Sequence, residues 1–242
     1  MLKKKEQKST KTKSKDLKPP AVTRRKRLPV DVEVEVKLPC DDVACLSDAG
    51  LELERVKARY FEDNWVYELP DGKLRKGQYL RIRYVGDGNG SGRNHAGLLT
   101  YKGKSKRESD ESKRKNKGRK VREEIETPVG KPSKLVKIFK RLGLRRSFRY
   151  QKYRTIYRVQ LDEERSLLAM FDETPIGNFL ELEGDAATIE SVARRLGYRR
   201  KDWIPLSYVE LQHALCVERG ESLRDMVFDE KPAAPRKPAK KK

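Results

Sequence analysis

Residues 31–38 read Asp-Val-Glu-Val-Glu-Val-Lys-Leu, and this strict alternation is the feature that most constrains the fold. Successive side chains of a β-strand point to opposite faces, so Glu33, Glu35 and Lys37 share one face and three valines share the other. Alone, the segment is typical of a half-buried strand with a solvated outer face. A functional interpretation requires the same charged face in other strands.

Later strand-like segments repeat this arrangement. Eight strands are predicted, at 31–38, 55–61, 78–85, 99–102, 121–127, 150–161, 167–172 and 178–184. Eight antiparallel strands can close into a barrel, and closure would turn one charged face into an enclosed site. Beyond the first strand, the charged residues of this face are Arg81, Arg83, Lys102, Arg122, Glu124, Glu126, Lys152, Arg154, Asp172, Glu181 and Glu183.

Four other segments predict helices, at 41–49, 132–142, 185–196 and 207–218. The second of these places its apolar residues on one side and ends before Gly143, as expected for a helix that packs on a sheet. We therefore expect an α+β fold, a closed eight-stranded antiparallel β-barrel with surrounding helices.

The net charge of +21 is concentrated in three segments. Residues 1–28 contribute +10, residues 102–122 contribute +8 and residues 231–242 contribute +6, so the rest of the chain carries −3. We expect disordered basic tails at 1–28 and 229–242 and a mobile basic insertion at about 103–120. One domain over 29–228 remains, and the tails predict at most weak, non-specific contact with nucleic acid or another polyanion.

The sequence argues against a zinc site, a phosphate-binding P-loop and a membrane or secreted location. The three cysteines form no Cys-x-x-Cys pair and the only histidines are His95 and His213, which argues against a zinc site. The glycine-rich segment 86–97 lacks the Gly-Lys-Ser/Thr of a phosphate-binding P-loop. Because no run has the length of a membrane span or the apolar core of a signal peptide, we expect a soluble, cytoplasmic protein without membrane contact.

In chain order the charged motifs are Glu-x-Glu-x-Lys, Arg-x-Arg, Lys, Arg-x-Glu-x-Glu, Lys-x-Arg, Asp and Glu-x-Glu. From about Pro29 to Leu211 this ordered set resembles the CYTH family of triphosphate tunnel metalloenzymes. The family includes class IV adenylyl cyclases, thiamine triphosphatases and inorganic triphosphatases. Tyr60-Phe61 also resembles a family pair, although Ala58 stands where the family usually has an acid.

The resemblance implies a role for each charge. A triphosphate carries about four negative charges near neutral pH, and lysine and arginine can hold its oxygens. The implied triphosphate-binding residues are Lys37, Arg81, Arg83, Lys102, Arg122, Lys152 and Arg154.

The carboxylates would repel that substrate unless a divalent cation lay between them, and carboxylate oxygens suit Mg²⁺ or Mn²⁺. The implied metal ligands are Glu33, Glu35, Asp172, Glu181 and Glu183. Lys37, Glu124 and Glu126 are the implied catalytic residues, the two glutamates orienting basic side chains or positioning water. The alternative is a barrel of purely structural salt bridges, which would cost several kcal/mol of desolvation per ion.

The favoured activity is metal-dependent hydrolysis of a phosphoanhydride bond, of the inorganic triphosphatase type, with tripolyphosphate, ATP or thiamine triphosphate as substrate. A class IV adenylyl cyclase is the first alternative, because segments 152–157 and 172–183 look like those of bacterial class IV cyclases. Two further alternatives are a non-catalytic polyphosphate- or nucleotide-binding module and a protein directed to RNA 5′-triphosphate ends. The sequence does not identify the pocket for an organic group.

Overall fold

The computed structural model describes residues 32–69, 78–86, 97–105 and 120–229. The predicted tail at 1–28 lies outside these residues, as do nearly all of the predicted tail at 229–242 and most of the insertion at 103–120.

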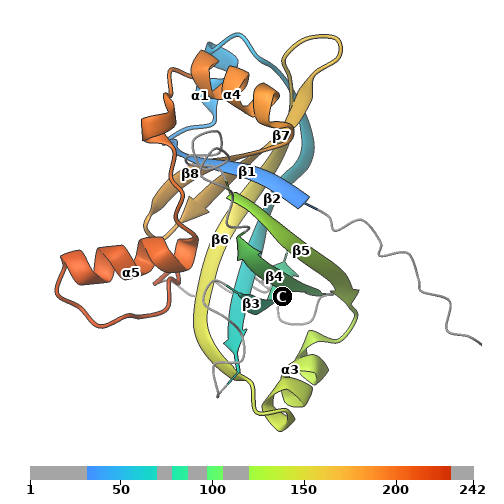
Figure 1. Ribbon diagram of the computed structural model, residues 1–242, viewed down its shortest axis with the longest axis vertical. Coiled ribbons are helices and arrows are strands. Elements are labelled where there is room, and N and C mark those ends of the chain that lie inside the picture. The colour runs from blue at the N-terminus through green and yellow to red at the C-terminus, as the bar shows by residue number, and fades with distance from the viewer. Residues whose placement is uncertain (1–31, 70–77, 87–96, 106–119, 230–242) are drawn as a thin grey trace, which may run out of the picture.

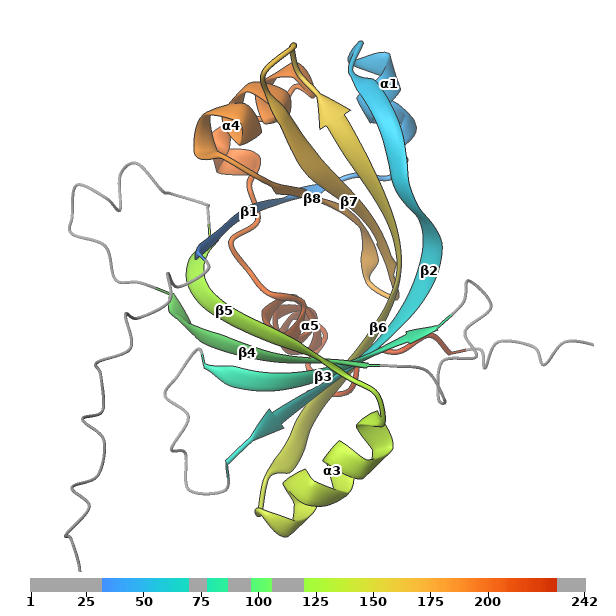
Figure 2. The same cartoon turned by 90° about the vertical axis from the view of Figure 1, so that its right-hand side faces the viewer.

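Eight strands in the described residues form one sheet that closes on itself, in the order β1-β5-β4-β3-β2-β6-β7-β8 (Figures 1 and 2). Every neighbouring pair is antiparallel, which confirms the predicted α+β barrel. The strands are β1 (Val32–Pro39), β2 (Glu52–Glu68), β3 (Tyr79–Gly86), β4 (Gly97–Ser105), β5 (Lys120–Val129), β6 (Arg145–Gln160), β7 (Ser166–Thr174) and β8 (Gly177–Glu183).

Strand β1 closes the barrel because its two halves have different partners. Its first half pairs with β5, from Val32 to Glu35, and its second half pairs with β8, from Glu35 to Pro39. Strands β2 and β6 are 17 and 16 residues long, and they pair along almost their whole length. The second strand was predicted only over 55–61, so the structure extends it at both ends.

The helices are α1 (Ala44–Asp48), α3 (Pro132–Arg141), α4 (Ala186–Arg195) and α5 (Tyr208–Glu218), with a short 3₁₀-helix η2 (Arg200–Asp202). Side-chain hydrogen bonds to backbone amides fix where two of these helices begin. The Asp185 carboxylate accepts hydrogen bonds from the first amides of α4, and Ser207 caps α5 in the same way. Helix α1 is shorter than predicted, beginning only at Ala44, whose amide donates to Asp42.

The barrel is apolar on its outside and charged on its inside. Leu38, Leu180 and Leu182 point away from the barrel axis and form a core with Ile189 and Val192 of α4. Helix α3 covers β3 in a second cluster, and α5 covers part of β6 in a third. Because side chains alternate along each strand, packing the apolar faces against helices leaves the charged faces to line the interior.

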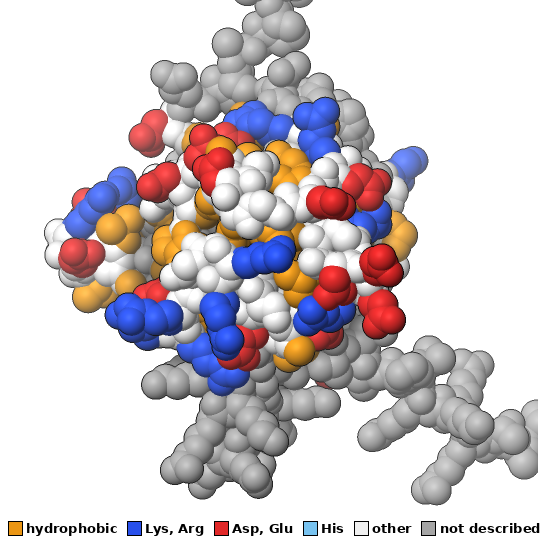
Figure 3. Space-filling model, turned by 90° about the horizontal axis from the view of Figure 1, so that it is seen from above, with side chains coloured by type: hydrophobic (Ala, Val, Ile, Leu, Met, Phe, Trp, Pro, Cys, Tyr) orange, Lys and Arg blue, Asp and Glu red, His pale blue; other side chains and the backbone are white. Residues whose placement is uncertain are grey.

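The end of the barrel near α1 and α4 carries charges of both signs. On the face seen in Figure 3, acidic and basic side chains of the described residues lie interspersed among apolar ones. In the part of the chain that the structure describes, no helix is long and apolar enough to cross a membrane.

Candidate active site

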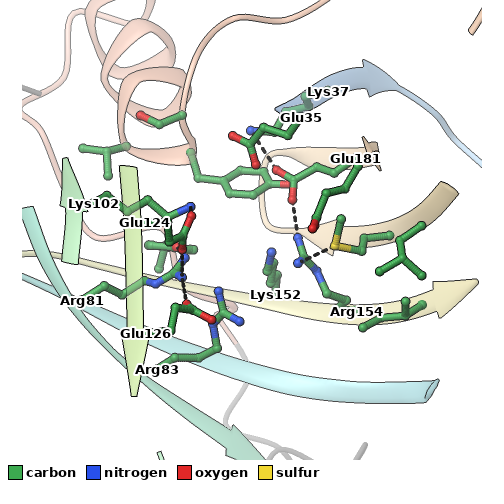
Figure 4. Close-up of a pocket in the computed structure, with 18 of the residues that line it drawn as sticks. Glu35, Lys37, Arg81, Arg83, Lys102, Glu124, Glu126, Lys152, Arg154 and Glu181 are labelled. Carbon is green, nitrogen blue, oxygen red and sulfur yellow. Dashed lines mark hydrogen bonds and ion pairs between the residues drawn. The ribbon is translucent and has the colours of Figure 1, made fainter. Parts of the chain in front are cut away.

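A cavity of about 270 Å³ occupies the barrel interior. Its wall is unusually ionic, with six lysine and arginine side chains and five glutamates, so the lining has a net charge near +1. The ten labelled residues of Figure 4 converge on this space from β1, β3, β4, β5, β6 and β8. The charged lining residues are Glu35, Lys37, Arg81, Arg83, Lys102, Glu124, Glu126, Lys152, Arg154, Glu181 and Glu183.

One group of charges, the Arg81 cluster, comprises Arg81, Lys102, Glu124, Glu126 and Thr100. The Arg81 guanidinium donates to the Thr100 hydroxyl at 3.1 Å and lies 3.3–3.4 Å from carboxylate oxygens of Glu126 and Glu124. Lys102 Nζ lies 2.5 Å from Glu124. Glu124 is thus held between two cations, whereas the Glu126 side chain remains 37% exposed. This cluster can hold an anion and still reach water.

A second group, the Asp172 cluster, lies on β6, β7, β8 and β1 and comprises Lys37, Lys152, Arg154, Asp172 and Glu181. The fully buried Asp172 accepts two hydrogen bonds of 2.6 Å from Arg154 and one of 2.9 Å from Lys152. Glu181 contacts Arg154 and lies 3.2 Å from Lys37 Nζ. Two cations are therefore oriented by one buried carboxylate.

Tyr208, the first residue of α5, is a site residue that sequence reasoning missed. Its hydroxyl donates to Asp172 Oδ2 at 2.6 Å, and its ring lies 3.9 Å from Lys37 Nζ and 5.1 Å from Lys152 Nζ. Burial and the negative charge of Asp172 hold the pKa of Tyr208 well above its usual value, so the hydroxyl stays a donor. Tyr208 is thus a positioning residue for two lysines.

Two substitutions at Tyr208 separate its hydroxyl from its ring. Tyr208→Phe removes one hydrogen bond to a buried carboxylate, and we expect the free energy of unfolding to fall by about 1.5–3 kcal/mol while KM changes little. Tyr208→Leu also removes the cation–π contact, and we expect KM for a triphosphate to rise about ten-fold. Chemical denaturation and steady-state kinetics measure the two effects. Equal KM values for both variants would contradict a role for the ring.

Glu62 is the second residue that was missed. It is fully buried on β2, 3.5 Å from Arg83 and 3.6 Å from Lys152. Burial alone would raise its pKa, but the positive charges of Arg83 and Lys152 outweigh burial and hold the pKa of Glu62 below its usual value. The sequence could have indicated Glu62, because it follows Tyr60 by two residues and therefore lies on the same face of the strand. The predicted strand ended one residue too early to include it.

The structure brings most of the predicted site residues together. All of the predicted catalytic and triphosphate-binding residues except Arg122 line the cavity, as do Glu35, Glu181 and Glu183 among the predicted metal ligands. Asp172 lies behind the lining within its cluster. The side chains of Glu33 and Arg122 lie outside the described residues, although their backbones pair across β1 and β5.

The predicted metal ligands are the chemically suitable oxygen donors of this site. Glu35 and Glu183 are direct neighbours across β1 and β8, and Glu181 faces the same cavity. Among the described side chains, no three carboxylate, histidine or cysteine groups stand close enough to hold a metal by themselves. Mg²⁺ commonly takes one or two carboxylates and completes its shell with substrate phosphates and water, and this donor set fits that pattern.

Comparison with known proteins finds that the model of the CYTH domain matches residues 31–202. The Methanocaldococcus jannaschii protein named "Putative adenylate cyclase MJ0240" is 29% identical over 195 residues, which is 75% of this chain and 98% of that protein. The solved structure of PH1012 protein from Pyrococcus horikoshii is 25% identical, with a TM-score of 0.53, over 74% of this chain and 98% of that one. A conserved hypothetical protein from Pyrococcus furiosus is 26% identical, with a TM-score of 0.52, over 74% and 99%.

Proposed function

The chain belongs to the CYTH domain family, and from this premise we propose that it is a metal-dependent triphosphatase that hydrolyses a phosphoanhydride bond of a triphosphate-containing substrate. The observation that carries the proposal is the gathering of six cations and five carboxylates around one cavity. A purely structural network of this size would bury many ions at a cost of several kcal/mol each. A polyanionic substrate would explain why the cations are gathered, because it could bind to all of them at once.

The charge balance of the cavity supports a metal as well. A lining with a net charge near +1 cannot neutralise a triphosphate of about four negative charges. We propose that Glu35 and Glu183, with Glu181 nearby, hold Mg²⁺ or Mn²⁺ together with phosphate oxygens. The bound ion would supply countercharge to the phosphoryl group.

The protein side chains would perform the remaining steps. Arg81 and Lys102 hold one end of the triphosphate, and Lys37, Lys152 and Arg154 hold the other. Glu124 keeps the first two cations in place through its contacts with both. We propose that Glu126, the most exposed carboxylate of the Arg81 cluster, accepts a proton from an attacking water, a role that its 37% exposure supports. Cations already fixed by carboxylates need little reorganisation when charge develops at phosphorus.

The direct test is to incubate the purified protein with tripolyphosphate, ATP and thiamine triphosphate, each with Mg²⁺, with Mn²⁺ or with EDTA. We expect orthophosphate with either metal and none with EDTA. Orthophosphate release that is unchanged by EDTA would overturn the metal proposal, and no product from any substrate would favour a non-catalytic binding module.

Substitution of a proposed metal ligand should change the metal requirement. Because Glu183→Gln keeps the shape of the side chain but removes its charge, we expect the Mg²⁺ concentration for half-maximal rate to rise at least about ten-fold. Glu173→Gln is the matched control, since Glu173 pairs with Arg59 on the surface. A Mg²⁺ titration of both variants measures the effect. An unchanged titration for Glu183→Gln would remove it from the metal site.

Adenylyl cyclase activity is the second candidate. It is favoured by the name of the Methanocaldococcus relative, of which this chain covers nearly the whole length. Cyclisation of ATP by its ribose 3′-hydroxyl would use the same cations and metal but release cyclic AMP and pyrophosphate. Chromatography of the ATP reaction therefore distinguishes the two activities. The RNA-directed alternative depends on the basic tails, which lie outside the described residues.

A further inference from the structure

Two of the three cysteines of this chain lie side by side. Cys40 directly follows β1 and Cys45 is the second residue of α1, and their sulfur atoms are 3.2 Å apart. All three cysteines are free thiols. Cys216 lies on another helix, α5, where its sulfur contacts the side chain of Gln212. The chain therefore contains one close pair of thiols and one separate thiol that serves as an internal reference.

The pair lies at the end of the barrel where α1 and α4 are found (Figure 1). Cys40 is 5% exposed and belongs to the core that α4 covers, whereas Cys45 packs against that core and is only partly buried. The described residues that line the ionic cavity do not include either cysteine. Of the two thiols, Cys45 is thus the one that a small molecule can reach from solvent.

A disulfide between these two residues needs only a small movement. An S–S bond is about 2.05 Å long, so the two sulfur atoms must approach each other by about 1.2 Å. Cys40 is held by the sheet, because its amide donates to the carbonyl of Asn178 on β8. Cys45 lies on a helix of five residues in which Leu46 is the buried side chain. Because α1 is short and lightly packed, we expect this helix to supply the movement.

The two thiols differ in reactivity as well as in exposure. Burial and the neighbouring Cys45 raise the pKa of the Cys40 thiol to about 12. Its hydrogen is also engaged, since the Cys40 thiol donates to the carbonyl oxygen of Asp42 at 3.1 Å. A buried, protonated thiol is inert toward solutes. Cys40 can therefore react only with a sulfur that is held beside it, and Cys45 provides that sulfur.

We propose that Cys40 and Cys45 form a peroxide-sensitive modification site, in which Cys45 is oxidised first and Cys40 then closes a reversible disulfide. The disulfide ties α1 to the end of β1. It closes a short loop and stabilises the protein chiefly by restricting the unfolded chain. A dithiol reduces it again. Because the site lies outside the ionic cavity, this proposal does not depend on the proposed triphosphatase activity.

Hydrogen peroxide is the oxidant in this reaction. The Cys45 thiolate attacks one peroxide oxygen, the O–O bond breaks, and a sulfenic acid forms while the released hydroxide takes up the proton that the thiol lost. The Cys40 sulfur then attacks the Cys45 sulfur. The S–O bond breaks, and hydroxide leaves with the Cys40 proton as water. Two thiols are thus oxidised to one disulfide, and one peroxide is reduced to two waters.

Peptide mapping of the native, full-length protein tests the proposal. The protein is treated with hydrogen peroxide, unfolded in iodoacetamide to block the remaining thiols, and digested with trypsin. Cleavage after Lys37 and Arg55 leaves both cysteines in one peptide, 38–55. We expect this peptide to carry no alkyl group and to be lighter by two hydrogens. Dithiothreitol before alkylation should restore two alkylated cysteines, and Cys216 should be alkylated throughout.

Two serine variants test the order of the steps. In Cys45→Ser, we expect loss of the Cys40 thiol to be at least about ten-fold slower than in the wild type, because the residue that reacts first is absent. Cys216→Ser is the matched control, and it should form the disulfide at the wild-type rate. Loss of the Cys40 thiol at the wild-type rate in Cys45→Ser would overturn the proposed order.

Thermal unfolding measures the consequence of the disulfide. Peroxide should raise the melting temperature of the wild type by about 5 °C, the effect of closing a loop of this length, and should leave Cys45→Ser unchanged. An unchanged melting temperature for the oxidised wild type would contradict the stabilising role. Two alkylated cysteines in peptide 38–55 after peroxide, or disulfides only between molecules on a non-reducing gel, would overturn the site itself.

Discussion

Replacing Arg81 with methionine is expected to lower kcat/KM for the turned-over triphosphate by about 10²- to 10³-fold, the effect of removing one preorganised charge-stabilising group. Arg81 is only 5% exposed, and its guanidinium already lies in place between Thr100, Tyr150 and two glutamates. Methionine fills similar space but offers no positive charge. Steady-state kinetics with each of the three triphosphates measures the loss.

The Arg81 prediction has a surface control and a conservative variant. Arg146→Met removes an arginine that pairs with Asp225 at the surface, and we expect its activity to equal that of the wild type. Arg81→Lys keeps a charge but cannot bridge the same partners, so an intermediate rate is expected. If Arg81→Met retained wild-type activity while folded, Arg81 would serve only to balance Glu124 and Glu126.

Replacing Asp172 with asparagine is expected to lower the free energy of unfolding by about 3–5 kcal/mol, because it leaves buried cations without their partner. Asp172 is fully buried and accepts hydrogen bonds from Lys152, Arg154 and Tyr208. Urea denaturation monitored by tryptophan fluorescence measures the change. Glu54→Gln is the control, because its pair with Arg158 is exposed and should contribute at most about 1 kcal/mol.

The same variant distinguishes two roles for Asp172. The sequence predicts a metal ligand, whereas the contacts in the structure favour an anchor for cations. An anchor predicts the same loss of stability with Mg²⁺ and with EDTA. If Asp172 is instead a metal ligand, we expect the variant to have the wild-type free energy of unfolding in EDTA and to need more Mg²⁺ for turnover. That result would contradict the anchoring role.

Much of the fold followed from local patterns. Alternation along 31–38 placed Glu35 and Lys37 on the face opposite the valines, and the structure confirms that this face lines the interior. The helices were predicted from their caps and apolar spacing, which depend on residues within a turn or two of each other. The ends of β2 were missed because register shifts interrupt its alternation near both ends, and because the length of its pairing depends on β6, a distant strand.

The sequence by itself determined the strands and the ionic interior, through the alternation of charged and apolar residues. It also determined the family, through the order of the charged motifs. Only the tertiary structure decided which charges meet, because closure of the barrel sets the register between strands that are far apart in the chain. It brought Tyr208 onto Asp172 across 36 residues and Lys37 onto Glu181 through the pairing of β1 with β8. It also decided that Ile156 and Leu168 face the cavity, since burial of an aliphatic side chain depends on what packs against it.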